Sequence, residues 1–284
     1  MKKIIKILNH ESKHWVGDGF HVHGIIRPTP DIYEHTNPFI LMDYASPQKF
    51  NATPRKLGVG AHPHKGFETV TFAIQGEVEH RDSSGGGGVI KTGGVQWMTA
   101  GRGIVHEEFH SRDFAKEGGV FEMVQLWVNL PKKDKLTSPK YQGLNKDKFP
   151  VKKLDGSDVK VIAGKFQDLI GAAQTFTQMN IYEIEMDKDK ELSFNLDAGT
   201  NTAILAIDGE VIIDGKELPM RNIALFSKEG DKIQIQSTKK SRLLLLNAEP
   251  IDEPIFAHGP FVMNTREEIS QAIEEYNNGD MGHL

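Results

Sequence analysis

Apolar and polar residues follow one another in short runs over most of the chain, and Gly, Pro, Asn and Asp residues separate these runs. Many of the runs are rich in β-branched residues and are closed by turn residues, which is typical of an all-β sandwich or barrel. The sequence therefore predicts an all-β fold with few, short helices.

The C-terminal segment carries the clearest helical pattern. Thr265 can cap a helix, and Glu268 three residues later completes the pattern of a capping box. Apolar side chains then recur at helical spacing, at Ile269, Ala272, Ile273 and Tyr276. We expect a single C-terminal helix that packs against the rest of the protein through this stripe.

A short repeat indicates two copies of one fold. Residues 73–78, AIQGEV, recur 133 positions later as residues 206–211, AIDGEV. The same offset pairs His62 with Asn195 and His64 with Asp197. We therefore expect the second copy to keep the scaffold without the imidazoles.

The polar segment between the two copies predicts a domain boundary. Residues 131–150 contain three prolines and no strand pattern. This gives an N-terminal metal-binding domain at 1–132, a linker at 133–148 and a C-terminal domain without metal ligands at 149–284.

Two pairs of polar side chains point to a metal site in the first copy. His62 and His64 are two residues apart, and in an extended strand such residues share one face. His106 and Glu108 form a second pair of this kind after a glycine-containing turn. We expect two strands to present these four side chains to a single metal ion.

The types of donor limit the choice of ion. Three imidazoles and one carboxylate suit divalent Fe, Mn, Co, Ni, Cu or Zn, whereas Ca and Mg prefer oxygen ligands. The chain has no cysteine, so thiolate ligands, disulfides and a cysteine nucleophile are excluded. An octahedral ion with four protein ligands keeps two positions open for a substrate or O₂.

Other candidate residues are left without a role in the site. His21 and His23 also lie two apart, but no second pair in a matching strand accompanies them, so we interpret them as ordinary strand residues. His110 follows the metal-site pair on the same strand face and is expected at the rim of the site or just behind its ligands. In the strand at 120–130, either alternate face can look into the cavity: Phe121, Met123, Gln125 and Trp127, or Val124, Leu126 and Val128.

Charge and hydropathy exclude other classes of function. The formal net charge is −5, and Lys and Arg are scattered, which disfavours direct binding of nucleic acid. Lys6 interrupts the apolar start of the chain, and no stretch is long and apolar enough to span a bilayer. We expect a cytoplasmic protein that does not bind membranes.

Four segments of the chain resemble the pirin family of bicupins: HPHKGFETV at 62–70, QWMTAGRGIVHEE at 96–108, LWVNLP at 126–131 and HGPFVMNTREEI at 258–269. The resemblance implies two facing, jelly-roll-like cupin β-barrels, with a metal in the N-terminal one. Its ligands would fall on His62, His64, His106 and Glu108. Many other cupins take the carboxylate of the HxHxxxE pattern, here Glu68, so the identity of the fourth ligand stays open.

The resemblance also implies two kinds of function. The first is quercetin 2,3-dioxygenase activity, in which a metal, iron or else Mn, Ni, Co, Cu or Zn, binds a flavonol and O₂. Glu108 would then act as the catalytic base on the flavonol 3-hydroxyl. The alternative is a metal-dependent transcription cofactor that acts through protein partners.

Overall fold

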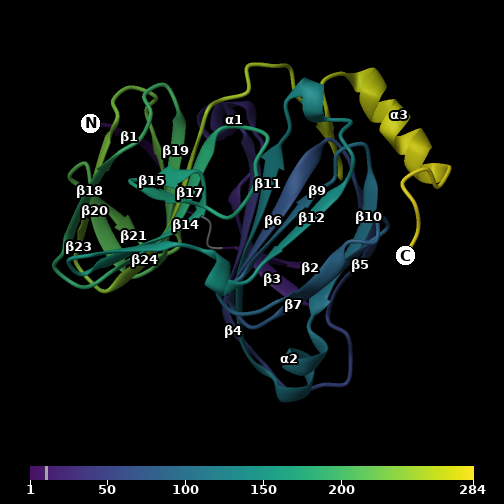
Figure 1. Ribbon diagram of the computed structural model, residues 1–284, viewed down its shortest axis with the longest axis horizontal. Coiled ribbons are helices and arrows are strands. Elements are labelled where there is room, and N and C mark those ends of the chain that lie inside the picture. Colours follow the sequence, from purple (N-terminus) through teal and green to yellow (C-terminus); the bar gives the residue numbers. More distant parts are fainter. Residues whose placement is uncertain (10–11) are drawn as a thin grey trace. The chain divides into compact units, whose positions relative to one another are not determined.

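The computed structural model describes residues 1–9 and 12–284 and confirms an all-β protein with few helices (Figure 1). The chain divides into two compact units. The first unit comprises Ser12–Ile26, Phe39–Lys146 and Asp252–Leu284, and the second comprises the described part of Met1–Glu11 with Arg27–Pro38 and Asp147–Ile251. Each unit thus combines segments from both halves of the chain. The domain boundaries given above as a linear division stay a prediction.

The first unit contains a seven-stranded and a four-stranded sheet. The larger sheet has the order β12 (Lys140–Leu144), β9 (Val95–Thr99), β6 (Phe67–Gln75), β11 (Gly119–Asn129), β4 (Phe39–Phe50), β3 (Phe20–Ile26) and β2 (Lys13–Val16). The smaller sheet has the order β5 (Gly58–His64), β10 (Ile104–His110), β7 (Val78–Asp82) and β8 (Gly87–Ile90). Strand β12 lies within the segment expected to be a linker, where it pairs with β9.

The second unit repeats this arrangement. Its larger sheet has the order β1 (Ile4–Asn9), β22 (Asn222–Phe226), β19 (Asn201–Asp208), β24 (Ser241–Ala248), β17 (Met179–Met186), β14 (Ser157–Ala163) and β13 (Val151–Leu154). The smaller sheet has the order β18 (Glu191–Asn195), β23 (Lys232–Ser237), β20 (Glu210–Ile213) and β21 (Lys216–Pro219). Short pairs are also formed by β15 (Lys165–Phe166) with β16 (Leu169–Ile170) here, and by β25 (Phe256–His258) with β26 (Phe261–Met263) in the first unit.

The sequence repeat occupies the same turn in both units. The AIQGEV segment joins β6 to β7, and AIDGEV joins β19 to β20. Gly76 and Gly209 adopt the left-handed region there, with φ of +86° and +75°, which explains why glycine recurs. The prediction of two cupin copies is confirmed, each built from two open sheets among the described strands.

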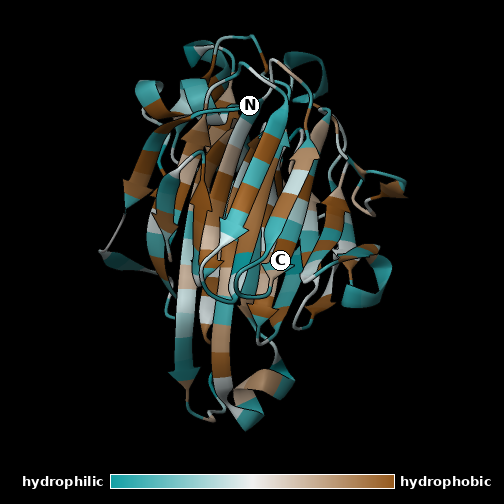
Figure 2. Ribbon diagram, turned by 90° about the vertical axis from the view of Figure 1, so that its left-hand side faces the viewer, coloured by the Kyte–Doolittle hydropathy of each residue, from teal (hydrophilic) through white to brown (hydrophobic). Residues whose placement is uncertain are grey.

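The hydrophobic core of each unit lies between its two sheets. Strands carry alternating hydrophobic and hydrophilic bands in Figure 2, as expected where one face is buried. In the second unit, Val159 and Ile204 of the larger sheet join Val211 and Ile233 of the smaller sheet in one buried cluster. These apolar contacts hold the sheets of each unit together.

The described residues form three α-helices, α1 (Pro30–Thr36), α2 (Arg112–Glu117) and α3 (Arg266–Asn277), and two 3₁₀-helices at Lys132–Asp134 and Lys146–Lys148. None of these helices has the length and apolar character needed to cross a membrane. The cytoplasmic location expected from the sequence stays a prediction.

Helix α3 confirms the predicted C-terminal helix and its cap. The Thr265 hydroxyl accepts a hydrogen bond from the Glu268 amide at 3.1 Å, and the Glu268 carboxylate accepts one from the Thr265 amide at 3.1 Å. Ile269 and Ala272 are buried against Val105 of β10, so the helix packs on the first unit. Tyr276, at the end of the predicted stripe, is 39% exposed.

Replacing Thr265 by alanine should destabilise this helix by about 1 kcal/mol, because one amide of the first turn loses its acceptor. A lower melting temperature in calorimetry would measure the loss. The matched control is Ser270→Ala on the exposed side of the same helix, for which we expect a change below about 0.5 kcal/mol. Equal losses in the two variants would contradict the role of the cap.

Candidate metal centre

Strands β5 and β10 bring three of the four predicted ligands together. The two strands pair antiparallel, with His106 opposite His62. The candidate ligand nitrogens of His62, His64 and His106 all lie within 4.8 Å of one another. Among the described residues, no other group of three His, Asp or Glu side chains has this geometry.

The free nitrogens of the three rings fit a metal ion. Nδ1 of His62 lies 2.8 Å from the Gly60 carbonyl and Nδ1 of His64 lies 3.4 Å from the Pro260 carbonyl. When each Nδ1–H donates to its carbonyl, Nε2 is left with a lone pair. Nε2 of His106 is buried and has no hydrogen-bond partner among the described residues. A buried nitrogen without a hydrogen-bond partner, next to two further nitrogens with available lone pairs, is a donor arrangement that suits a metal ion, so the residues fit a metal.

Burial keeps the deepest imidazoles neutral. It lowers the pKa of His106 well below its usual value, and the neighbouring rings of His64, His62 and His80 lower it further. Burial and the adjacent His62 likewise lower the pKa of His64. A neutral imidazole offers its lone pair to a metal without first releasing a proton.

Glu108 lies at the same cavity but outside the group of three histidines. The strand register shifts between His106 and Glu108, and Glu108 is not among the residues whose ligand atoms lie within 4.8 Å of one another. Its Oε1 accepts hydrogen bonds from the Gln96 amide and from the Thr71 hydroxyl, the latter at 3.0 Å. Hydrogen bonds from described residues reach only Oε1, so Oε2 is left for the cavity that Glu108 lines.

Glu68, the alternative fourth ligand, points the other way. It is an odd number of residues from Thr71 on β6, so the two side chains lie on opposite faces of the sheet. Glu68 is 1% exposed, accepts a hydrogen bond from Thr99 at 2.7 Å and is absent from the cavity wall. Burial raises the pKa of Glu68 to about 7, despite the hydrogen bond from Thr99.

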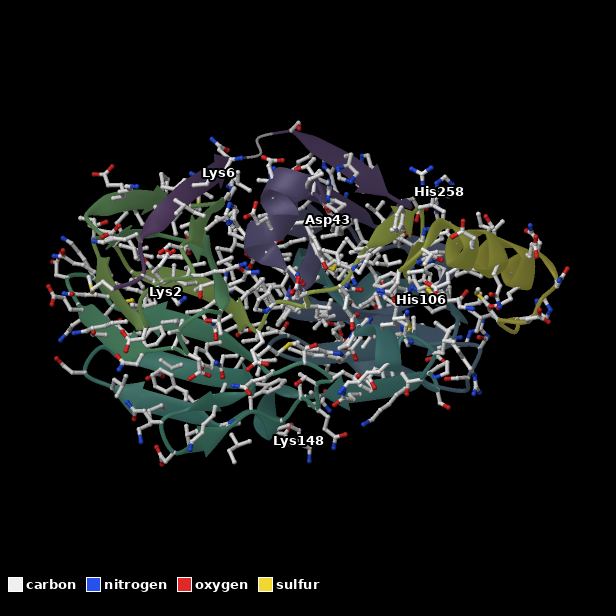
Figure 3. All side chains as sticks on the ribbon, turned by 90° about the horizontal axis from the view of Figure 1, so that it is seen from above. Lys2, Lys6, Asp43, His106, Lys148 and His258 are labelled. Atoms are coloured by element: carbon white, nitrogen blue, oxygen red, sulfur yellow. The ribbon has the colours of Figure 1, made fainter. Side chains whose placement is uncertain are left out.

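The cavity beside the histidines is about 270 Å³ in volume and mostly apolar. Besides His62, His64 and Glu108, its wall comprises Val16, Phe20, Val22, Leu41, Asp43, Val59, Met123, Gln125, Trp127 and Pro260. The structure thus settles which face of β11 looks into the cavity, because Met123, Gln125 and Trp127 line it. Figure 3 labels Asp43 of β4 and His106 among the side chains of this unit.

Two contributions to the site were missed by the sequence analysis. His80 and Asp82 on β7 lie beside His106, with Nδ1 of His80 3.4 Å from Nδ1 of His106. The signal was present, since His80 and Asp82 form a third pair at a spacing of two. Pro260, almost 200 residues from His64 in the chain, supplies its carbonyl from the C-terminal segment, and no local pattern reveals that.

The remaining histidines of the first unit do not join the site. His110 was expected at the rim or just behind the ligands, and this is wrong: its ring stacks on Phe121, with centroids 4.4 Å apart, in an aromatic cluster, and its Nε2 lies 3.0 Å from the Gly19 carbonyl. His23 is 3.3 Å from the Ser46 hydroxyl, and His21 stacks on Trp15. These two are ordinary strand residues, as expected.

The second unit shows what occupies the equivalent positions. Asn195 on β18 faces Lys232 on β23, as His62 faces His106 in the first unit. Asn195 and Asp197 line a cavity of about 490 Å³, and the Gln178 amide donates to the Asp197 carboxylate at 3.0 Å. An amide, a carboxylate and an ammonium thus stand where the first unit has three imidazoles.

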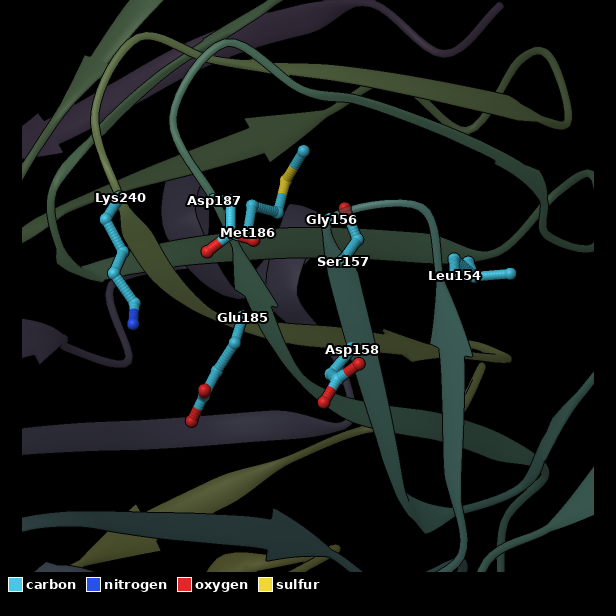
Figure 4. Close-up of a pocket in the computed structure, with 8 residues that line it drawn as sticks. All are labelled: Leu154, Gly156, Ser157, Asp158, Glu185, Met186, Asp187 and Lys240. Carbon is cyan, nitrogen blue, oxygen red and sulfur yellow. The ribbon is translucent and has the colours of Figure 1, made fainter.

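Another cavity of the second unit, of about 330 Å³, is lined by carboxylates (Figure 4). Asp158, Glu185 and Asp187 lie around it together with Lys240. These carboxylates do not converge into a ligand group of the kind that the three histidines form.

Comparison with known proteins identifies the family. The profile of pirin matches residues 20–128, and that of the pirin C-terminal cupin domain matches residues 181–282. The chain belongs to the pirin family. Among structures with this fold, the crystal structure of quercetin 2,3-dioxygenase from Acinetobacter baumannii is 45% identical and covers 99% of both chains with a TM-score of 0.95.

Two further pirin-family relatives extend over nearly the whole chain. A Pseudomonas aeruginosa protein provisionally named as a quercetin 2,3-dioxygenase is 42% identical over 281 residues, 98% of each chain. Human pirin is 34% identical over 287 residues, covering 99% of this chain and 94% of its own. Both cupin units are therefore shared with the relatives.

Proposed function

We propose that this pirin-family protein is a metal-dependent dioxygenase that cleaves a flavonol such as quercetin with O₂. The observation that carries the proposal is the group of three histidine nitrogens, two of whose residues, His62 and His64, line an apolar cavity together with Glu108. The similarity to a structure named quercetin 2,3-dioxygenase supports it.

Four side chains would hold one divalent transition metal. His62, His64 and His106 would bind through Nε2, and Glu108 would complete the set through Oε2. Bound there, the ion would polarise a substrate oxygen as a Lewis acid and offer an open position to O₂. We propose iron first, with Mn, Ni, Co, Cu or Zn as alternatives, because the same donor set accepts each of them.

Glu108 would take the proton of the flavonol 3-hydroxyl. Hydrogen bonds from Thr71 and Gln96 fix Oε1, so the proton would go to the second lone pair of Oε2, the oxygen that would also bind the ion. A positioned carboxylate of this kind typically contributes about 10²–10⁴-fold to a proton transfer. The deprotonated flavonol would be an anion, and its negative charge would be attracted to the divalent ion.

The cavity wall would bind and orient the flavonol rings. Its apolar side chains, Trp127 and Phe20 among them, offer surfaces for an aromatic ligand and exclude water. Asp43 and Gln125, which pair across β4 and β11, add polar groups for ring hydroxyls. At about 270 Å³ the cavity is slightly smaller than most ligand pockets, which favours one compact aromatic molecule.

Incubation with quercetin tests the proposal. The protein, freed of metal and reloaded in turn with Fe, Mn, Ni, Co or Cu, should consume quercetin and release carbon monoxide in air and do neither under nitrogen. We expect Glu108→Gln at saturating metal to slow the reaction by about 10²–10⁴-fold. The matched control is Glu68→Gln, whose carboxylate faces away from the cavity and whose replacement should leave turnover unchanged.

If no metal-loaded form consumes quercetin or releases carbon monoxide, although the metal is bound, the dioxygenase proposal is wrong. The alternative, a metal-dependent transcription cofactor that acts through protein partners, would then be favoured. It stays a prediction.

A further inference from the structure

A buried chain of three side chains runs from His106 across the smaller sheet. Nδ1 of His106 lies 3.4 Å from Nδ1 of His80, and Nε2 of His80 lies 3.1 Å from Oδ2 of Asp82. The side chains of His80 and Asp82 are wholly inaccessible to solvent, and His106 is 0% exposed. The chain forms because β7 pairs with β10 and places Asp82 directly opposite His106.

Counting hydrogens along this chain gives one arrangement compatible with metal binding. A neutral imidazole carries a single N–H, so His106 can offer Nε2 to an ion only when its hydrogen is on Nδ1. That Nδ1–H must be accepted by Nδ1 of His80. The hydrogen of His80 is then on Nε2, where it donates to the Asp82 carboxylate.

Hydrogen bonds from the following turn fix the Asp82 carboxylate as a hydrogen-bond acceptor for His80. Its Oδ1 accepts hydrogen bonds from the Ser84 amide at 2.8 Å, the Ser84 hydroxyl at 2.6 Å and the Gly86 amide at 3.0 Å. Oδ2 is thereby directed to Nε2 of His80. The turn after β7 thus fixes the carboxylate, and the carboxylate fixes the hydrogen of the imidazole.

Tyr141 on β12 holds the His80 ring and links it to the other side of the site. The two rings are stacked, with centroids 4.8 Å apart and planes 13° from parallel. The Tyr141 hydroxyl donates to the Gln96 carbonyl oxygen at 3.4 Å, and the Gln96 amide donates to Glu108. One buried network therefore orients both His106 and Glu108.

We infer that Asp82 and His80 are positioning residues, which set the tautomer of His106 and thereby direct its Nε2 to the metal. Metal-bound histidines commonly donate their second N–H to a carboxylate or carbonyl, which fixes the ring and raises its basicity. Here an imidazole is interposed between ligand and carboxylate. The inference rests on the proposed metal site but not on flavonol chemistry.

The substitution Asp82→Asn tests this inference because it keeps the shape and reverses one hydrogen bond. The carbonyl oxygen of asparagine can keep accepting from Ser84 and Gly86, so its NH₂ group faces His80. His80 must then accept at Nε2 and donate from Nδ1, which obliges His106 to accept at Nδ1 and to carry its hydrogen on Nε2. We expect the affinity for Co²⁺ or Zn²⁺ to fall by about 10–100-fold, the typical effect of losing such a partner.

Nitrogen NMR of the histidine rings provides a readout that a purely structural role would not change. In wild-type protein, before and after addition of Zn²⁺, the hydrogens should be on Nδ1 of His106 and Nε2 of His80. Asp82→Asn should exchange both positions in the metal-free protein. The matched control is His23→Gln, which removes another buried histidine of the same unit and should leave the metal affinity and both tautomers unchanged.

Three results would each overturn the inference: a hydrogen on Nε2 of His106 in the wild-type protein, a wild-type metal affinity in folded Asp82→Asn, or an equal loss of affinity in His23→Gln. The first needs no variant and so decides the matter even if Asp82→Asn fails to fold. Because these readouts are affinity and tautomer, a failure of quercetin turnover leaves them intact, and the two proposals can fail separately.

Discussion

His106→Ala should reduce the affinity of the protein for divalent transition metals by more than about 100-fold, beyond the loss typical of a residue that only supports a ligand. Among the three histidines His106 is the most buried, and its Nε2 has no hydrogen-bond partner in the described part of the chain. The variant keeps only the imidazoles of His62 and His64, and the carboxylate of Glu108 lies outside their group. Equilibrium dialysis with elemental analysis should find about one metal per wild-type chain and almost none in the variant.

Thermal unfolding offers an independent measure of the same loss. A ligand present at 100 times its dissociation constant stabilises the folded state by about 2.7 kcal/mol, so added metal should raise the melting temperature of the wild-type protein. His106→Ala should show no such rise. His62→Ala should behave in the same way if all three imidazoles bind one ion.

The matched control is His110→Ala on the same strand. His110 is also buried, but it packs among aromatic rings and lies outside the cluster of three histidines. This variant should melt at a lower temperature and still bind metal. Metal retained by both His62→Ala and His106→Ala, or lost equally from His110→Ala, would contradict the assignment of the site.

The sequence alone was sufficient to place His62 and His64 side by side because strand geometry determines their shared face. Residues two apart in a strand share a face whatever sheet the strand joins, so His62 and His64 had to point together. The capping box at Thr265 is local in the same way, since its partners are three residues apart. Such features need no knowledge of tertiary structure.

The rest of the site depends on non-local pairing, which the sequence does not encode in any short pattern. His80 reaches His106 only because β7 lies next to β10 in the sheet. To decide whether Glu68 or Glu108 lines the cavity, one must know which face of β6 is turned towards the cavity. The hydrogen bond from Thr71 to Glu108 identifies that face, and Glu68 lies on the opposite one. Strand pairing, rather than composition, decides which polar residues meet.

The second large effect concerns Glu68 and the dependence of stability on pH. Burial raises the pKa of Glu68 from 4.5 to about 7 in the folded protein. Below about pH 4.5 both the folded and the unfolded chain keep the proton of Glu68, so this residue does not lower the free energy of unfolding. As the pH rises towards 7, the unfolded chain releases its proton while the folded chain keeps it, and stability falls until the folded carboxyl also ionises.

Glu68→Gln should remove this loss, because glutamine cannot ionise and its carbonyl can still accept the hydrogen bond from Thr99. A shift of about 2.5 pH units corresponds to roughly 3 kcal/mol. The metal-free variant should therefore be more stable than the wild-type protein at pH 8 by an amount approaching this value, and about equally stable at pH 4. Melting temperatures of the two proteins, measured in a chelator from pH 4 to pH 8, give the difference.

The same variant decides between the two carboxylates, which makes it more informative than a stability measurement alone. If Glu68 faces away from the ion, Glu68→Gln gains stability at pH 8 and keeps the wild-type metal affinity. If Glu68 is instead the fourth ligand, its replacement loses metal, and the variant gains less stability in metal-loaded than in metal-free protein. If the melting temperatures of the wild-type protein and Glu68→Gln change with pH in parallel, the pKa of Glu68 is not raised in the folded protein. That result would contradict the prediction.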